Sequence, residues 1–139
     1  MRSQLHSKFT PEEYLAFERR SSERHEYLDG ELFAMSGASK RHNQIVVNLS
    51  REISTQFKGR SCVVYTNDMR VRIAGTARYN YPDVVALCGQ ASFDDKEQDT
   101  LINPNLVIEV LSASTEAYDR GETCISWLQT FARRNLRQS

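Results

Sequence analysis

Two short apolar runs separated by an acidic loop place the strongest constraint on how this chain folds. The first run covers residues 81–87 and the second covers residues 104–112. Both are rich in β-branched residues and bounded by turn formers, which predicts two buried β-strands. Each run carries one carboxylate, Asp83 in the first and Glu109 in the second. Because an ionised carboxylate is costly to bury unless it is paired, hydrogen-bonded or metal-bound, two of them on one sheet could converge on a divalent cation.

Bulk properties indicate one domain over residues 1–139, long enough to bury a core. No apolar run reaches the roughly 20 residues that a membrane span needs. The first residues lack the apolar core of a signal peptide, so we expect a cytoplasmic protein. The three cysteines, Cys62, Cys88 and Cys124, are widely spaced and include no C-x-x-C pair. This pattern predicts reduced thiols, two of them in strands, rather than a disulfide framework or a zinc site.

The first half of the chain predicts two helices and a hairpin. Thr10 and Pro11 begin a short amphipathic helix expected to cover one side of a sheet. Residues 25–35 predict a β-hairpin around Asp29-Gly30. A longer helix is expected over residues 40–57, capped by Ser39 or a neighbour and by Gly59, with His42 at the top of a buried apolar face.

The second half predicts strands over residues 62–65 and 69–73, in addition to the two apolar runs, and a final helix after Ser114. Residues 75–80 and 93–103 are predicted to be loops. In the strand at 69–73, apolar residues alternate with Arg70 and Arg72, which predicts one buried face and one basic face.

The net charge is zero but unevenly distributed. Residues 36–80 hold eight Lys or Arg against two Asp or Glu, and residues 81–119 hold eight acids against Lys96 alone. A basic middle beside an acidic centre suits a polyanion held next to a metal site. Solvated surface charge that happens to cluster is the alternative interpretation.

Several motifs, in a fixed order, resemble those of a known family. They are Thr10-Pro11-Glu12-Glu13-Tyr14-Leu15, Glu26 to Leu32, Met35-Ser36-Gly37 with His42-Asn43, Tyr81-Pro82-Asp83-Val84, Pro104 to Ser112, Ser114-Thr115, and Asp119-Arg120-Gly121-Glu122. Together they resemble the Uma2 family of restriction-endonuclease-like proteins, which is abundant in cyanobacteria. Pro82-Asp83 followed by the strand with Glu109 is also similar to the PD-(D/E)xK nuclease pattern.

The resemblance implies an α/β (α+β) fold with a mixed central β-sheet flanked by helices, and a homodimer. It implies that Asp83 and Glu109 hold Mg²⁺ or Mn²⁺, with the backbone carbonyl of Val110 as a further ligand. Glu31 matches an acidic position on the early hairpin, and His42 matches a helix histidine facing the site. The implied activity is hydrolysis of DNA phosphodiester bonds, with Lys40, Arg70 and Arg72 as candidate phosphate contacts.

Two departures from the pattern leave other hypotheses open. The nuclease pattern has a lysine two residues after the second acid, where this chain has Leu111, and family members carry a lysine where this chain has Thr123. Arg120 is a poor substitute because its high pKa excludes it as a base. The sequence after about residue 122 is expected to depart from the family and to lack its closing strands. A catalytically inactive nuclease-like domain that binds nucleic acid or a partner, and a metal-free structural domain, are therefore the alternatives to an endonuclease.

Overall fold

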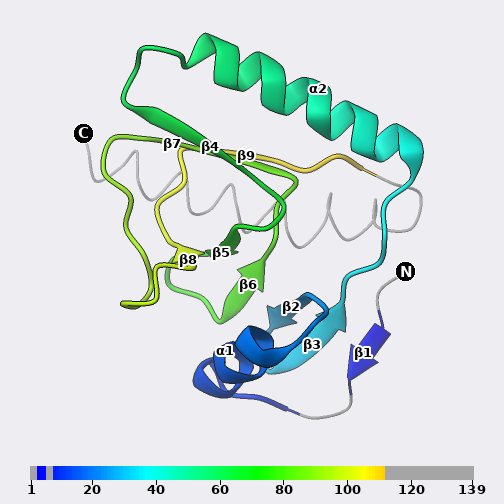
Figure 1. Cartoon of the computed structure of the whole chain (residues 1–139). Helices are drawn as coiled ribbons and strands as arrows, with labels where there is room; N and C mark the ends of the chain where they lie inside the picture. The colour runs from blue at the N-terminus through cyan, green and yellow to red at the C-terminus, as the bar shows by residue number, and fades with distance from the viewer. Residues whose placement is uncertain (1–2, 6–7, 112–139) are drawn as a thin grey trace.

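The structure is a computed structural model in which residues 3–5 and 8–111 are described. Within these residues there are two helices, and nine strands that form two sheets (Figure 1). The elements in chain order are β1 (Ser3–Leu5), α1 (Pro11–Arg20), β2 (His25–Leu28), β3 (Glu31–Ala34), α2 (Lys40–Gln56), β4 (Cys62–Thr66), β5 (Arg70–Arg72), β6 (Arg78–Asn80), β7 (Val84–Cys88), β8 (Thr100–Leu101) and β9 (Leu106–Ile108).

Sheet A has six strands in the order β1-β3-β2-β6-β5-β8, and sheet B has three in the order β4-β7-β9. Sheet A is mixed, because β8 pairs parallel with β5 while its other pairs are antiparallel. Helix α2 lies along sheet B and contacts β4 and β7 (Figure 1). The predicted α+β fold with a mixed sheet is confirmed, although the strands are divided between two sheets rather than gathered in one.

Helix α1 covers one face of sheet A, as predicted. The Thr10 hydroxyl accepts a hydrogen bond from the Glu13 backbone N–H at 3.1 Å, and Pro11 occupies the first helical position. Tyr14 of α1 stacks on Tyr27 of β2 with ring centroids 4.9 Å apart. This pair belongs to a buried cluster of Tyr14, Leu15, Tyr27, Leu32 and Tyr79. Burial of these large side chains against the sheet stabilises a helix that is too short to persist alone.

A second buried cluster lies between the two sheets. Sheet A contributes Val71 of β5, Ile73 directly after β5, and Leu101 of β8. Sheet B contributes Val85 and Leu87 of β7. Because residues alternate between the two faces of a strand, Val85 and Leu87 turn toward sheet A, and Val84 and Ala86 turn toward α2. Both faces of β7 are therefore buried, which explains its uninterrupted apolar sequence.

The hairpin and the cap of α2 agree with the predictions. Asp29 and Gly30 have φ values of 48° and 98°, as a type I′ turn requires. Ser39 caps α2 by accepting a hydrogen bond from the His42 backbone N–H at 3.1 Å. Two details of α2 were predicted wrongly: Phe57 rather than Gly59 is the C-cap residue, and none of the helix residues is fully buried. The apolar face of α2 is half-covered instead.

Three strands lie in segments for which no strand was predicted. β6 and β8 lie within the segments predicted to be loops, and β1 precedes α1. β6 is polar, yet it pairs with β2 on one side and with β5 on the other. The predicted strands β4 and β5 are confirmed, but the turn between them carries the chain from sheet B to sheet A.

The prediction of reduced cysteines is wrong for two of the three. Cys62 and Cys88 lie directly opposite each other in the β4–β7 ladder and form a disulfide. Their placement in strands was predicted correctly, but their register was not visible in the sequence, where they are 26 residues apart. Cys124 and the helix predicted after Ser114 lie outside the described residues. Neither described helix is long and apolar enough to cross a membrane.

Candidate active site at the start of β7

Asp83 stands at the meeting point of three elements, directly before β7, near the start of α2 and beside the end of β9. Its Oδ2 atom lies 3.3 Å from Nε2 of His42 and accepts a hydrogen bond of 2.7 Å from the Val110 backbone N–H. The side chains of His42 and Asp83 are only 15% and 13% exposed. The other ring nitrogen of His42, Nδ1, is buried and has no hydrogen-bond partner among the described residues. His42 thus lies beside Asp83, while its role in a site stays a prediction.

The second predicted carboxylate, Glu109, lies at the same end of sheet B as Asp83. Val84 and Ile108 are the last pair of the antiparallel β7–β9 ladder, and Asp83 and Glu109 are the residues directly beyond that pair. Glu109 is half-buried and engaged in a further interaction. The two acids therefore flank the same end of the β7–β9 ladder, and their convergence on one ion stays a prediction.

The donor chemistry of this pair fits one class of metal ion. No group of three or more His, Cys, Asp or Glu side chains in residues 3–5 and 8–111 is arranged to hold an ion. A tetrahedral zinc site, which needs three or four protein ligands, does not match this arrangement. Mg²⁺ keeps several waters and is commonly held by one or two carboxylates together with substrate phosphate. Asp83 and Glu109 fit that requirement.

Glu31 lies elsewhere. It is the first residue of β3 and pairs with Leu28 beside the turn of the hairpin. The β2–β6 register runs from Leu28 and Arg78 toward His25, so Asp83 lies beyond the opposite end of β2. No hydrogen bond or ion pair joins Glu31 to Asp83 or His42 in the described part of the chain.

A different hairpin carboxylate, Glu26, lies on the side of sheet A that faces sheet B. Glu26 is 2% exposed and accepts a hydrogen bond of 3.1 Å from Asn80, which is equally buried. Alternation along β2 and β6 turns both side chains away from α1, toward the cluster between the sheets. Asn80 precedes Asp83 by three residues in the chain, but its hydrogen bond with Glu26 joins β6 to β2, so the pair is a feature of sheet A. The sequence signal was the same alternation: Tyr27 faces α1, so its neighbour Glu26 must face the other way.

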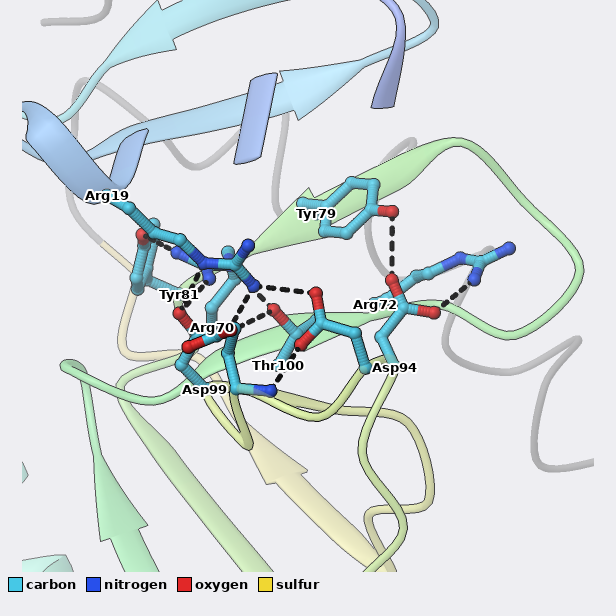
Figure 2. Close-up of polar contacts among 10 residues, drawn as sticks. Arg19, Arg70, Arg72, Tyr79, Tyr81, Asp94, Asp99 and Thr100 are labelled. Carbon is cyan, nitrogen blue, oxygen red and sulfur yellow. Dashed lines mark hydrogen bonds and ion pairs between the residues drawn. The ribbon is translucent and has the colours of Figure 1, made fainter. Parts of the chain in front are cut away.

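The expected basic face of β5 does not form at Arg70. This side chain is 5% exposed. Its guanidinium donates to the Thr100 hydroxyl at 2.8 Å and to the Tyr81 hydroxyl at 3.1 Å, and it lies 2.8 Å from an Asp99 carboxylate oxygen (Figure 2). Tyr81 in turn donates to Glu18 of α1 at 2.9 Å. A buried charge requires such partners, so Arg70 is occupied within the fold.

The outer part of this network ties the acidic loop to the rest of the fold. Arg19 of α1 makes two hydrogen bonds to Asp99 and one to Asp95, and Arg72 pairs with Asp94, which also accepts a hydrogen bond from Tyr79 (Figure 2). The hydrogen bonds from Arg19 hold the pKa of Asp99 well below its usual value. Burial raises the pKa of Tyr81 to about 12. Because the acids of residues 93–99 neutralise arginines of α1 and β5, their clustering has a structural explanation.

Four positions are candidates for a cation that assists the site, and two of them lie among the residues that the structure describes. Lys40 begins α2 two residues before His42, is exposed, and makes no ion pair with another described residue. Leu111 occupies the position where the nuclease pattern has lysine and is 38% exposed. Arg120 and Thr123 lie outside the described residues. Lys40 is therefore the predicted phosphate contact that is exposed and unpaired among the described residues.

Two curated relatives come from Synechocystis sp. (strain ATCC 27184 / PCC 6803 / Kazusa). "Uncharacterized protein slr1290" is 45% identical over 114 residues, which are 82% of this chain and 59% of the relative. "Uncharacterized protein sll1609" is 36% identical over 113 residues, or 81% of this chain and 64% of the relative. The chain thus spans about three fifths of the length of these relatives.

A solved structure and a family model complete the comparison. A crystal structure from Anabaena variabilis ATCC 29413, described as a "putative nuclease belonging to DUF820", superposes with a TM-score of 0.64 at 19% identity, covering 88% of this chain and 67% of the other. At that identity the likeness shows the fold alone. The model of the Uma2 family, described as "Putative restriction endonuclease", matches residues 11–133, which extends past residue 122, where the sequence was expected to depart from the family. The chain therefore belongs to the Uma2 family.

Proposed function

We propose that this chain is a metal-dependent endonuclease that hydrolyses DNA phosphodiester bonds at the site formed by Asp83 and Glu109. The observation that carries the proposal is the end of the β7–β9 ladder at Val84 and Ile108, beyond which Asp83 and Glu109 are the next residues of the two chain segments. Membership of the Uma2 family supports a nuclease-like function. The fold of the neighbouring structure from Anabaena variabilis agrees with it.

The residues of the chain have separate parts in the proposed reaction. A bound Mg²⁺ or Mn²⁺ would supply Lewis-acid polarisation of the phosphodiester and activation of a water. Asp83 and Glu109 would hold this ion, together with the carbonyl of Val110. The Val110 backbone N–H and His42 both contact Oδ2 of Asp83, so they fix the orientation of that carboxylate and leave Oδ1 for an ion. Orientation of this kind before the substrate arrives is what lowers the cost of binding the transition state.

The proposal includes a cytoplasmic homodimer. Both features rest on the family resemblance and on the expectations drawn from the sequence. Molar mass by light scattering tests the dimer, with twice the chain mass of 16.0 kDa expected.

Cleavage of supercoiled plasmid DNA tests the activity. The parent chain should convert supercoiled DNA to nicked or linear forms with Mg²⁺ or Mn²⁺ and should not do so with excess chelator. Asp83→Asn and Glu109→Gln should each lose this activity, because each removes a negative ligand. Glu97→Gln, in the exposed acidic loop, is the matched control and should cleave as the parent does. Equal cleavage by the parent and Asp83→Asn would contradict the proposal.

A second candidate function is a nuclease-like domain without catalysis that binds nucleic acid or a partner subunit. Leu111 favours it, since no lysine or arginine among the described residues forms an ion pair with Asp83. Metal-independent DNA binding by the parent, without cleavage at any metal concentration, would be the result expected of this alternative.

A further inference from the structure

We propose that the outward face of α2, with Lys40, Arg51 and Lys58, is the surface along which the phosphate backbone of duplex DNA lies. The proposal rests on the proposed function, because it assigns the DNA path of the same site. It begins from the charge of this segment. Residues 40–60 contain five cations and one acid (5 − 1 = +4), in a chain whose net charge is zero.

Helical geometry places these three cations in one row. Lys40 and Arg51 are 11 residues apart, and Arg51 and Lys58 are 7 residues apart. These intervals are close to three and two full turns of 3.6 residues, with rises of roughly 16 Å and 10 Å. Lys58 follows the C-cap residue Phe57, which keeps a right-handed helical conformation, so it continues the row.

The row lies on the opposite side of α2 from the apolar residues that contact sheet B. Val46, Leu49 and Ile53 are half-buried against β4 and β7. At 100° per residue, the row of cations is about 160° around the helix from them. Lys40, Arg51 and Lys58 are all exposed, Arg51 to 65% of its side chain. Gln44 and Asn48, which can also donate to phosphate, lie between them on the same face.

Within residues 3–5 and 8–111, these cations are free of the ion pairs that occupy five arginines of the fold, a property they share with Lys8, Arg20, Arg41, Arg60 and Lys96, which lie outside the row. Arg19, Arg24, Arg70, Arg72 and Arg78 each pair with a carboxylate of another element. In the part of the chain that the structure describes, Lys40 and Lys58 form no ion pair. Arg51 pairs only with its neighbour Glu52, at 3.6 Å and with both side chains exposed. A pair of this kind competes weakly with phosphate.

The position of the row relative to Asp83 connects it to the candidate active site. Lys40 precedes His42 by two residues, and His42 contacts Asp83. A helix of 17 residues is about 25 Å long, which matches roughly seven base pairs at 3.4 Å each. Duplex DNA that follows the outward face of α2 would therefore pass the end of the helix that carries His42, on the side turned away from the contact between His42 and Asp83. The regular spacing of phosphates along a duplex is the charge pattern that a row of cations complements.

Fluorescence anisotropy with a labelled duplex of mixed sequence, in EDTA and at several salt concentrations, tests the assignment. The variant Lys40→Gln/Arg51→Gln/Lys58→Gln should bind at least tenfold more weakly than the parent. Each lost phosphate contact should reduce the slope of log K against log salt by about 0.9, and three contacts by about 2.7. The matched control is Lys8→Gln/Arg20→Gln/Lys96→Gln, which removes the same charge from exposed positions elsewhere and should keep the parental slope. Thermal melts establish that both variants fold, as expected for exposed positions.

Three outcomes would overturn the assignment: an unchanged slope for the α2 variant, an equal loss for the control variant, or displacement of DNA by polyglutamate at equal charge concentration. The last outcome would assign the surface to acidic polypeptides. The two proposals fail separately, because EDTA excludes cleavage from this measurement. Binding through α2 without cleavage in Mg²⁺ would refute only the endonuclease, whereas cleavage by the α2 variant at parental affinity would refute only this surface.

Discussion

Reduction of the Cys62–Cys88 disulfide should destabilise the fold by an amount set by the chain that it closes. The disulfide joins residues 26 positions apart. The loop-closure relation for the unfolded chain, ΔS ≈ −2.1 − 1.5R ln n, gives about −12 cal/mol/K, or about 3.5 kcal/mol at 25 °C. At roughly 2.1 cal/mol/K of unfolding entropy per residue, this corresponds to a melting temperature about 12 °C lower for a chain of 139 residues.

Thermal melts with and without a phosphine reductant measure this effect in a Cys124→Ser background, which leaves only the paired cysteines. The same chain with Cys62→Ser and Cys88→Ser should melt at the lower temperature and should not respond to the reductant. Thiol titration under denaturing conditions should find no free thiol before reduction and two afterwards. Two free thiols before reduction, or an unchanged midpoint after complete reduction, would refute the reasoning.

Further predictions concern the buried network. Tyr81→Phe removes one hydrogen-bond partner from each of two buried residues, Glu18 and Arg70, and should lower the free energy of unfolding by roughly 2 kcal/mol in urea melts. The hydroxyl of Tyr65 bonds to no described residue, so the control Tyr65→Phe should change the free energy of unfolding little. Because the folded pKa of Tyr81 is raised to about 12, the parent should lose stability as the pH rises from about 10 toward 12, and Tyr81→Phe should lose less. Asp99→Asn should cost about 1 kcal/mol at pH 7, a figure discounted because 37% of the Asp99 side chain is exposed. The pKa of Asp99 is depressed in the folded state, so the stability difference between the parent and Asp99→Asn should be complete above the unfolded pKa of about 3.9 and should shrink as the pH falls below it. Urea melts at a series of acidic pH values measure this difference. A difference that does not change with pH would contradict the proposed ion pairs of Asp99.

Local signals predicted the elements whose residues determine their own conformation. Thr10-Pro11 and Ser39 specify helix starts through their caps, and Asp29-Gly30 specifies the hairpin through positive φ values. The apolar sequence of β7 indicated burial on both faces. Each of these depends on a few neighbouring residues, so the sequence contains the needed information.

Features that depend on pairing partners were not predictable in the same way. β6 is polar and becomes a strand because β2 and β5 flank it, and β8 is only two residues long. The disulfide requires the β4–β7 register, which no local pattern encodes.

The residues proposed for the candidate site could be named from the sequence, but the contacts that depend on distant partners could not. Asp83, Glu109 and His42 follow from the family motifs and from the cost of placing carboxylates in apolar strands. The burial of Arg70 was missed because its partners Tyr81, Asp99 and Thr100 are distant in sequence and meet only in the folded chain. The hydrogen bond between Asn80 and Glu26 was missed for the same reason, because it requires β6 to lie beside β2.

Metal-dependent stabilisation tests the central claim, the carboxylate site of Asp83 and Glu109, most directly. A ligand that binds only the folded state raises its stability by RT ln(1 + [L]/Kd), about 2.7 kcal/mol at 100 times Kd. Millimolar Mg²⁺ or Mn²⁺ should therefore raise the melting temperature of the parent and of the control Glu97→Gln, and should leave Asp83→Asn and Glu109→Gln unchanged. A cooperative melt of the parent without any metal response, or an equal response in Asp83→Asn, would contradict the account.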